Sequence, residues 1–207
     1  AGIVITASHN PPEYNGYKVY WKDGGQIVSP MAEELMSEIN NIMDFSGIKC
    51  LDGCSLDSFE NLHFLGEEMD KIYFANVKSL SLNTEVIKEA SDLKIVYTPL
   101  HGSGNMPVRR VLKEMGFENV YVVPEQEKPD GSFPTVLYPN PEEEESFSLA
   151  LKLAKKVDAD LILATDPDCD RVGVMVKKDK GEYLKLSGNQ TGVLLSHYTI
   201  DSQKSKG

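Results

Sequence analysis

Three aspartates alternate with other residues directly after an apolar run, a pattern that suits a metal ion. The run is Leu161-Ile162-Leu163-Ala164, and the acidic residues are Asp166, Asp168 and Asp170. Two carboxylates about 5 Å apart repel each other by about 3 kcal/mol at an effective dielectric constant of about 20, and a bound cation removes that cost. Carboxylate oxygens suit Mg²⁺, with water or phosphate completing the octahedron. These aspartates therefore form a candidate metal loop.

The same acidic pattern occurs in calcium-binding loops, in aspartyl phosphotransferases and in solvated turns. A calcium-binding EF-hand loop also begins with alternating acids, but it needs glycine at its sixth position and glutamate at its twelfth. Arg171 and Lys177 stand there, so that hypothesis fails. A phosphotransferase with an aspartyl nucleophile would be expected to carry a small hydrophobic or hydroxyl residue in place of Asp170 and a later acidic pair, and the rest of the chain has no obvious pair. A solvated acidic turn without metal stays open.

A hydroxyl and an imidazole are neighbours near the start of the chain. Ser8 and His9 follow the β-branched run 3–5. A loop serine beside an imidazole can be a nucleophile, although such a pair is more often only a capped loop. Its neighbours do not form the Gly-x-Ser-x-Gly turn of hydrolases. Lys18 lies in the next predicted strand, where it is either a phosphate-binding or proton-carrying group or an exposed strand lysine.

The first part of the chain is expected to contain two strands and two helices. β-Branched and aromatic runs predict strands over 3–5 and 17–21. Ser29 as N-cap and Pro30 as the first helical residue predict a helix to about residue 43. A second helix is expected over about 66–82.

From residue 93 onward, apolar strand patterns alternate with helical ones. The expected strands are 93–97, 120–123 and 161–164, with 172–176 continuing or pairing with the last; the expected helices are 105–115, 142–157 and 188–200. Such alternation predicts a doubly wound, parallel sheet. The candidate metal loop would then lie at the carboxyl end of a strand, where open α/β sheets bind ligands.

Composition and charge exclude several classes of protein. The net charge of −11 argues against a nucleic-acid partner, and no apolar run reaches the length of a membrane span. The chain has three cysteines, Cys50, Cys54 and Cys169, whose spacing is not that of a disulfide framework. No second cysteine pair or histidine cluster completes a zinc site. Both observations favour free thiols in a reducing cytoplasm. The chain begins within a predicted strand without methionine and ends in a polar tail, so we expect a piece of a longer protein.

Several motifs resemble those of the phosphoglucomutase and phosphomannomutase family, the α-D-phosphohexomutases. Thr6-Ala7-Ser8-His9-Asn10-Pro11 is similar to the family's phosphoserine loop. Asp166-Pro167-Asp168-Cys169-Asp170-Arg171 is similar to its metal loop, with Cys169 at the variable position. Further similar stretches follow in the same order along nearly the whole chain: 15–20, 98–102, 130–134, 139–141 and 188–190.

The resemblance implies an α/β fold with two doubly wound α/β/α layers of the phosphohexomutase type. The sheet would be mixed in the first layer and mostly parallel in the second. Residues 1–88 would be the later part of the family's domain 1 and carry the phosphoserine, 89–201 would be domain 2 with the metal loop, and 202–207 would be a tail. The family's sugar-recognition and phosphate-clamping loops belong to two further domains, which these residues do not resemble.

The resemblance also implies a reaction. The parent protein would be a phosphoglucomutase-type isomerase that interconverts hexose 1-phosphate and 6-phosphate through a phosphoserine and a bisphosphate intermediate. Ser8 would carry the phosphoryl group, and one Mg²⁺ would join its phosphate to Asp166, Asp168 and Asp170. Glucose 1,6-bisphosphate would be the activator and intermediate. We therefore expect Ser8 to lie close to the three aspartates in space.

Further residues have implied supporting roles. Arg171 would contact the phosphate, Lys18 would handle the hydroxyl proton, and His9 would support the serine by hydrogen bonding. His101 would brace a loop of domain 2. The strand 17–21 and the following turn look more like phosphoglucomutases, including the branch that approaches phosphopentomutase. Phosphomannomutase, phosphopentomutase and a non-enzymatic truncated product are the alternatives. The expected partner is a small sugar phosphate, the expected location is the cytoplasm, and this chain alone is expected to be inactive.

Overall fold

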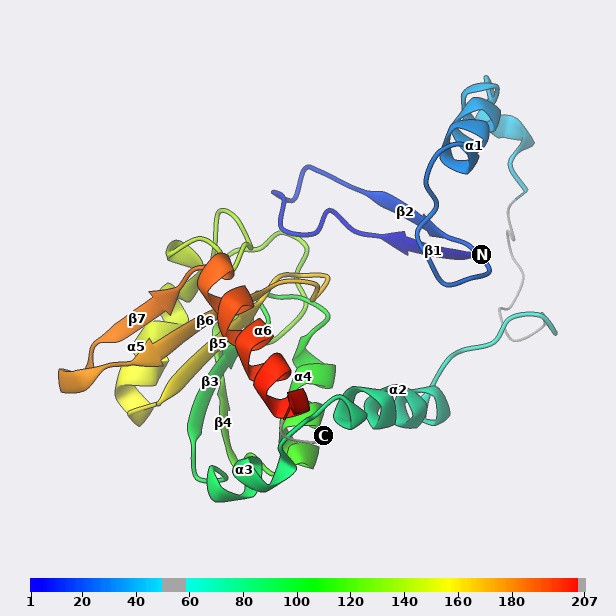
Figure 1. Cartoon of the computed structure of the whole chain (residues 1–207). Helices are drawn as coiled ribbons and strands as arrows, with labels where there is room; N and C mark the ends of the chain where they lie inside the picture. The colour runs from blue at the N-terminus through cyan, green and yellow to red at the C-terminus, as the bar shows by residue number, and fades with distance from the viewer. Residues whose placement is uncertain (50–58, 205–207) are drawn as a thin grey trace. The chain divides into compact units, whose positions relative to one another are not determined.

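The computed structural model describes residues 1–49 and 59–204 and divides into two compact units (Figure 1). Unit 1 comprises Ala1–Thr6 and Gly16–Asp70, and unit 2 comprises Ala7–Asn15 and Lys71–Gly207. The loop that carries Ser8 therefore belongs to unit 2, although the residues on either side of it belong to unit 1. Cys50 and Cys54 lie outside the described residues, and so does any pairing between them.

Unit 1 holds a hairpin and helices. Strand β1 (Gly2–Ile5) pairs antiparallel with β2 (Tyr17–Tyr20), in the places that the sequence predicted. Helix α1 (Met31–Asn40), the 3₁₀ turn η1 (Phe45–Gly47) and the start of α2 (Glu67–Ser79) follow. Among the described residues of this unit the hairpin is the whole sheet, so the predicted mixed sheet is not found there. A chain that returns without a crossover helix pairs antiparallel.

The start of α1 differs from the predicted cap. The helix begins one residue later than expected, at Met31, and Pro30 occupies the cap position. Ser29 does not cap the backbone, because its hydroxyl donates instead to the carboxylate of Glu33 at 2.7 Å. The helix ends at Asn40, a little before the predicted end.

Unit 2 is built on a five-stranded sheet with the order β4-β3-β5-β6-β7 (Figure 1). Its strands are β3 (Lys94–Thr98), β4 (Asn119–Val122), β5 (Leu161–Thr165), β6 (Val172–Lys177) and β7 (Tyr183–Leu186). β3 pairs parallel with β4 and with β5, whereas β5–β6 and β6–β7 are antiparallel. The fold class is α/β as predicted, but the sheet is mixed rather than mostly parallel.

The antiparallel half has a simple physical cause. A parallel neighbour needs a crossover of about a dozen residues or more. The connections 166–171 and 178–182 are too short for that, so β6 and β7 return directly beside the strand before them. The sequence pattern indicated that 172–176 either continues or pairs with the preceding strand, and pairing is what the structure shows. β7 was not predicted.

The helices of unit 2 largely follow the predictions. They are α3 (Thr84–Glu89), α4 (Asn105–Met115), α5 (Ser148–Val157) and α6 (Gly188–Lys204), with 3₁₀ turns η3 (Pro124–Gln126), η4 (Glu145–Phe147) and η5 (Asp179–Gly181). α4 ends at Gly116 as predicted, with the left-handed backbone (φ 106°) that glycine adopts at little cost. The α-helix expected from residue 142 begins only at Ser148, because Asn140 accepts the Glu142 N–H in a local turn.

The hydrophobic core of unit 2 lies between α5 and the sheet. Ala150 and Ala154 are one helical turn apart and fully buried, and their small side chains let the helix approach β3 and β5 closely. Phe147 and Ile162 are fully buried in the same cluster. None of the described residues of unit 1 is buried to this degree, so the packed core that positions a site is that of unit 2.

The end of the chain is helical further than expected. The predicted tail began at residue 202, but α6 continues to Lys204, and Ser202 is buried where it accepts a hydrogen bond from Asn83 at 2.8 Å. The limit predicted between residues 88 and 89 separates domains of the family. The compact units of this structure are defined differently, so that limit stays a prediction. None of the helices in 1–49 and 59–204 is long and apolar enough to cross a membrane.

Candidate functional site

The candidate site lies where two neighbouring strands end. β3 and β5 run parallel, with Thr98 opposite Ala164, so the loops that follow them leave the same edge of the sheet. β3 leads to β4 on one side, and β5 leads to β6 on the other. A crevice forms where connections part in this way, and ligands of α/β proteins bind there.

The three aspartates of the metal loop (residues 166–171) converge. Asp166, Asp168 and Asp170 each offer a carboxylate oxygen, and these atoms lie within 4.8 Å of one another. Asp166 is fully buried, and its Oδ1 accepts the backbone N–H groups of Asp170 at 3.1 Å and Arg171 at 2.9 Å. Cys169 has a left-handed backbone (φ 59°), which turns the chain tightly enough to bring the carboxylates together.

The electrostatics of this loop favour a cation. The pKa of Asp166 is raised to about 6, because burial and the neighbouring Asp168 outweigh the lowering effect of the hydrogen bonds from the Arg171 N–H and the Ser8 hydroxyl. A carboxylate in such surroundings is costly to ionise, and a bound divalent ion would offset that cost. Three clustered oxygen donors with no sulfur or nitrogen ligand match the preference of Mg²⁺, so the residues present fit that ion.

Ser8 lies against the metal loop. Its Oγ donates to Oδ2 of Asp166 at 3.0 Å, although 158 residues separate the two in sequence. The Nδ1 atom of His9 lies 3.1 Å from the same hydroxyl. This geometry confirms the prediction that the serine and the aspartates lie close together, and it places His9 where it can support the serine. The Ser8 backbone is left-handed (φ 54°), an uncommon conformation for a residue other than glycine.

The other predicted site residues have different surroundings. Arg171 extends toward Glu142, with 3.7 Å between Nη1 and Oε1, and both side chains are partly exposed. Lys18 lies on β2 of unit 1, so its part in the reaction stays a prediction. His101 is buried and bonds the Lys128 carbonyl at 3.1 Å and the Thr135 hydroxyl at 2.9 Å. His101 therefore braces its loop.

One contact of the metal loop was not predicted from the sequence. The backbone N–H and the hydroxyl of Ser103 both donate to the carbonyl of Pro167, at 2.8 Å and 3.0 Å. Ser103 directly follows the motif 98–102 that resembled the family, which was the available signal, but nothing in that motif indicated its partner.

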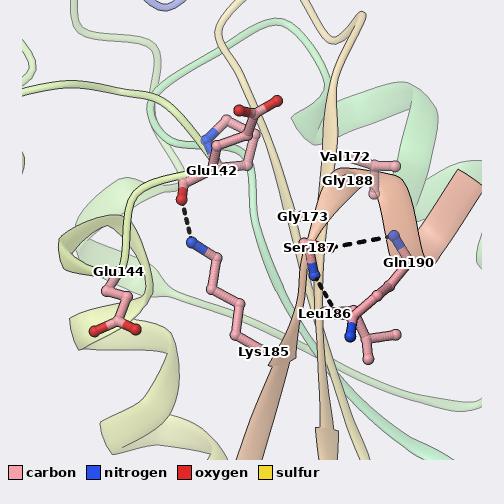
Figure 2. Close-up of a pocket in the computed structure, with 10 residues that line it drawn as sticks. Glu142, Glu144, Val172, Gly173, Lys185, Leu186, Ser187, Gly188 and Gln190 are labelled. Atoms are coloured by element: carbon pink, nitrogen blue, oxygen red, sulfur yellow. Dashed lines mark hydrogen bonds between the residues drawn. The ribbon is translucent and has the colours of Figure 1, made fainter.

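A cavity of about 290 Å³ lies beside the metal loop (Figure 2). Val172, which follows the loop, and Glu142, which pairs with Arg171, both line it. Gln190 also lines the cavity: its side-chain oxygen accepts the Ser187 N–H at 2.9 Å while its own backbone N–H donates to the Ser187 hydroxyl at 3.2 Å, a reciprocal cap that begins α6. The ammonium group of Lys185 donates to the Glu142 carbonyl.

Comparison with known proteins places the chain in a family. Residues 71–181 match the family described as phosphoglucomutase/phosphomannomutase, alpha/beta/alpha domain II, and residues 1–45 match its alpha/beta/alpha domain I. The chain therefore belongs to the phosphoglucomutase/phosphomannomutase family, as the motifs predicted.

Named relatives differ in the sugar that their names imply. A phosphopentomutase of Homo sapiens is 40% identical over 207 residues, which cover 100% of this chain and 34% of that protein. A phosphoglucomutase of Staphylococcus saprophyticus is 39% identical over 195 residues, covering 94% of this chain and 35% of that protein. A solved structure described as a putative phosphomannomutase from Thermus thermophilus shares the fold, with a TM-score of 0.59 and 24% identity over 84% of this chain and 36% of that one. The chain spans about a third of the length of the curated relatives it matches.

Proposed function

We propose that this chain supplies the phosphoserine and the magnesium site of a phosphoglucomutase-type enzyme, which interconverts hexose 1-phosphate and 6-phosphate. The observation that carries the proposal is the 3.0 Å hydrogen bond from Ser8 Oγ to Asp166, within a cluster of three carboxylates. A serine hydroxyl aimed at a candidate metal site is the arrangement that phosphoryl transfer requires, because positioning and charge stabilisation do most of the work in that reaction.

In the proposed reaction Ser8 carries the phosphoryl group at rest. The P–O bond to Ser8 Oγ breaks while a P–O bond to the free hydroxyl of the sugar monophosphate forms, giving glucose 1,6-bisphosphate when the sugar is glucose. The hydroxyl proton leaves through a base, for which Lys18 is the candidate, and Ser8 Oγ regains a proton. The reverse transfer from the other end of the bisphosphate completes the isomerisation.

The residues of the metal loop would hold Mg²⁺ and shape its surroundings. Asp166, Asp168 and Asp170 are the proposed protein ligands, joined by an oxygen of the Ser8 phosphate. When bound, Mg²⁺ supplies positive charge that stabilises the transferring phosphoryl group. Asp166 is held in place by the N–H groups of the loop. Arg171 would leave Glu142 to donate hydrogen bonds to the phosphate.

The sugar itself is the least constrained part of the proposal. Relatives named phosphopentomutase and phosphoglucomutase match this chain almost equally well, so a pentose phosphate is the second candidate and a mannose phosphate the third. A non-enzymatic truncated product is the remaining alternative; the juxtaposed Ser8 and aspartates argue against a degenerate site, though not against truncation. A small sugar phosphate as the partner and a cytoplasmic location are further parts of the proposal.

Phosphorylation of Ser8 by a sugar bisphosphate tests the proposal directly. The chain with Ser8 unphosphorylated is incubated with Mg²⁺ and either glucose 1,6-bisphosphate or ribose 1,5-bisphosphate, and intact mass spectrometry follows the gain of one phosphate. We expect the gain in the native chain and none in Ser8→Ala. Ser146→Ala is the control, since it removes the hydroxyl of another serine, in η4, and should still be modified. Modification that persists in Ser8→Ala would rule out the assigned nucleophile.

We also propose that this chain alone does not turn over sugar monophosphates. The parts that would grip the sugar are expected in the family's other domains, and positioning of this kind lowers a barrier by roughly 7–11 kcal/mol. A coupled assay with glucose 1-phosphate, Mg²⁺ and added bisphosphate should show at most slow hydrolysis. Turnover within about tenfold of a full-length relative, a difference of about 1.4 kcal/mol, would contradict this part.

A further inference from the structure

The loop after β3 lies against the metal loop after β5. We define the support loop as residues 102–104, which follow β3 by a few residues. From its contacts we infer that the support loop, with Ser103 as a positioning residue, sets the Mg²⁺ affinity of the three aspartates. This inference rests on the magnesium site of the proposed function and adds residues that do not themselves contact the ion.

The contact is made at the peptide group between Pro167 and Asp168, one of the two peptide groups that join the proposed ligands Asp166 and Asp168. Pro167 stands between Asp166 and Asp168, and its carbonyl accepts both the N–H and the hydroxyl of Ser103, at 2.8 Å and 3.0 Å. The proline ring already fixes φ at this position. Two donors on the carbonyl fix the orientation of the peptide that follows, which is the peptide of Asp168. The angle between the two carboxylates is therefore restrained from outside the metal loop.

The two glycines beside Ser103 show how closely the loops approach. A Cβ atom on Gly102 would lie 2.4 Å from the Cα of Pro167 and 2.6 Å from its carbonyl oxygen, and these backbone atoms cannot move aside cheaply. A Cβ atom on Gly104 would lie 2.7 Å from the Cys169 Sγ and 2.7 Å from the Tyr97 hydroxyl. A larger residue at Gly102 would therefore shift the backbone of the metal loop, and one at Gly104 would displace the side chains of Cys169 and Tyr97.

The support loop is itself held rigidly on the sheet. Leu100 and His101 both have left-handed backbones, and Leu100 is fully buried. The His101 N–H donates to the Gln126 carbonyl at 3.0 Å. Tyr97 and Thr165, on the paired strands β3 and β5, join their hydroxyls at 2.8 Å directly beneath the two loops. The anchored support loop can thus keep the carboxylates of the metal loop at a fixed spacing, although their charges repel each other.

The test compares Mg²⁺ affinity and stability across single substitutions in the full chain. Isothermal titration with MgCl₂ gives the dissociation constant, and thermal melting without Mg²⁺ gives the stability. We expect Ser103→Ala to weaken Mg²⁺ binding by about three- to tenfold, as for the loss of one hydrogen bond. Ser103→Thr, which keeps a hydroxyl, should restore it. Gly102→Ala should weaken binding by more than Ser103→Ala.

The control variant removes a serine that makes the same kind of hydrogen bond elsewhere in unit 2. The hydroxyl of Ser146 bonds two backbone carbonyls, those of Tyr138 at 3.1 Å and Asn140 at 2.8 Å. Ser146→Ala should lower the melting temperature and leave the Mg²⁺ affinity unchanged. If Ser103→Ala binds Mg²⁺ as the native chain does, the inference is overturned. If the native chain binds no Mg²⁺, or Asp168→Asn binds it equally well, the proposed metal site itself is wrong.

Discussion

Ser8, the proposed phosphoserine, contacts Asp166 with a backbone that serine adopts at a cost. Its φ of 54° lies in the left-handed region, where a residue with a Cβ atom is less stable than glycine by about 1–2 kcal/mol. We therefore expect Ser8→Gly to be more stable than Ser8→Ala by about 1 kcal/mol, because both lack the hydroxyl and only glycine relieves the backbone. Urea unfolding of the two variants measures the difference. Equal stability would mean that the loop does not keep this conformation in solution.

Phosphorylation of Ser8 should strengthen the metal site. The phosphate adds an oxygen ligand and nearly two negative charges beside Asp166. We expect Mg²⁺ to bind about tenfold or more tightly to the phosphorylated chain than to the unmodified one, and Asp168→Asn to weaken binding in both forms. Calorimetric titration of each form checks this. The same affinity with and without the phosphate would contradict a shared site.

Sequence reasoning predicted the residues of the candidate site, but it did not predict the contact of Ser103 that holds the metal loop in place. Ser8 and the three aspartates stand out because their types and spacing are chemical signals that can be read locally. The contact of Ser103 with Pro167 joins residues that are 64 positions apart, and an exposed serine beside two glycines is also what an ordinary turn looks like. Only the pairing of β3 with β5 makes the two loops neighbours, and sequence pattern does not give that pairing.

At the scale of elements, an ion pair joins the end of α5 to β6. The carboxylate of Asp158 accepts from Lys177 Nζ at 2.6 Å, and this hydrogen bond and charge hold the pKa of Asp158 below its ordinary value of 3.8. Because the pKa is lower in the folded state, ionised Asp158 contributes stability above about pH 4. That contribution is lost as the pH falls through the folded-state pKa.

In Asp158→Asn the free energy of unfolding should therefore fall less steeply as the pH drops below about 4. At neutral pH the free energy of unfolding should change little, because exposed ion pairs contribute weakly. Asparagine tolerates the left-handed backbone that Asp158 adopts (φ 56°), so the helix end is preserved. Urea unfolding at neutral and acid pH measures the effect. Asp92→Asn removes an exposed carboxylate outside this pair and should keep the native acid dependence. An unchanged acid slope in Asp158→Asn would show that the pair is not formed.

Element prediction succeeded where the signal is local. The strands at 3–5 and 93–97 and the glycine that ends α4 follow from β-branched runs and from the backbone freedom of glycine. The direction of β6 could not be read, since an apolar run looks the same in either direction. It becomes clear only from the short connection 166–171. Strand β7 was not predicted, because Tyr183–Leu186 includes a lysine and lies at the edge of the sheet, so it lacks the apolar run of a buried strand.

At the scale of the whole molecule, burial is unevenly shared between the units. β3 and β5 contain fully buried residues, whereas the described residues of unit 1 contain none. Local opening is easiest where few apolar side chains are buried. We expect the amides of β1 and β2 to exchange with deuterium about a hundredfold or more faster than those of β3 and β5, a difference of about 3 kcal/mol. Exchange followed by peptide mass spectrometry checks this, and equal protection would contradict it.

The discontinuous composition of unit 2 has a consequence for the order in which the molecule is made. The loop 7–15 leaves the ribosome before the metal loop, because the aspartate that its serine contacts lies 158 residues later. At about 5–20 residues per second, the nascent chain needs about 8 to 30 s to supply that partner. During this interval Ser8 can have neither its hydrogen bond to Asp166 nor a neighbouring metal loop. If Ser8 is the proposed nucleophile, it is synthesised before the residues that complete its site, and its phosphorylation through that site must follow translation of the metal loop.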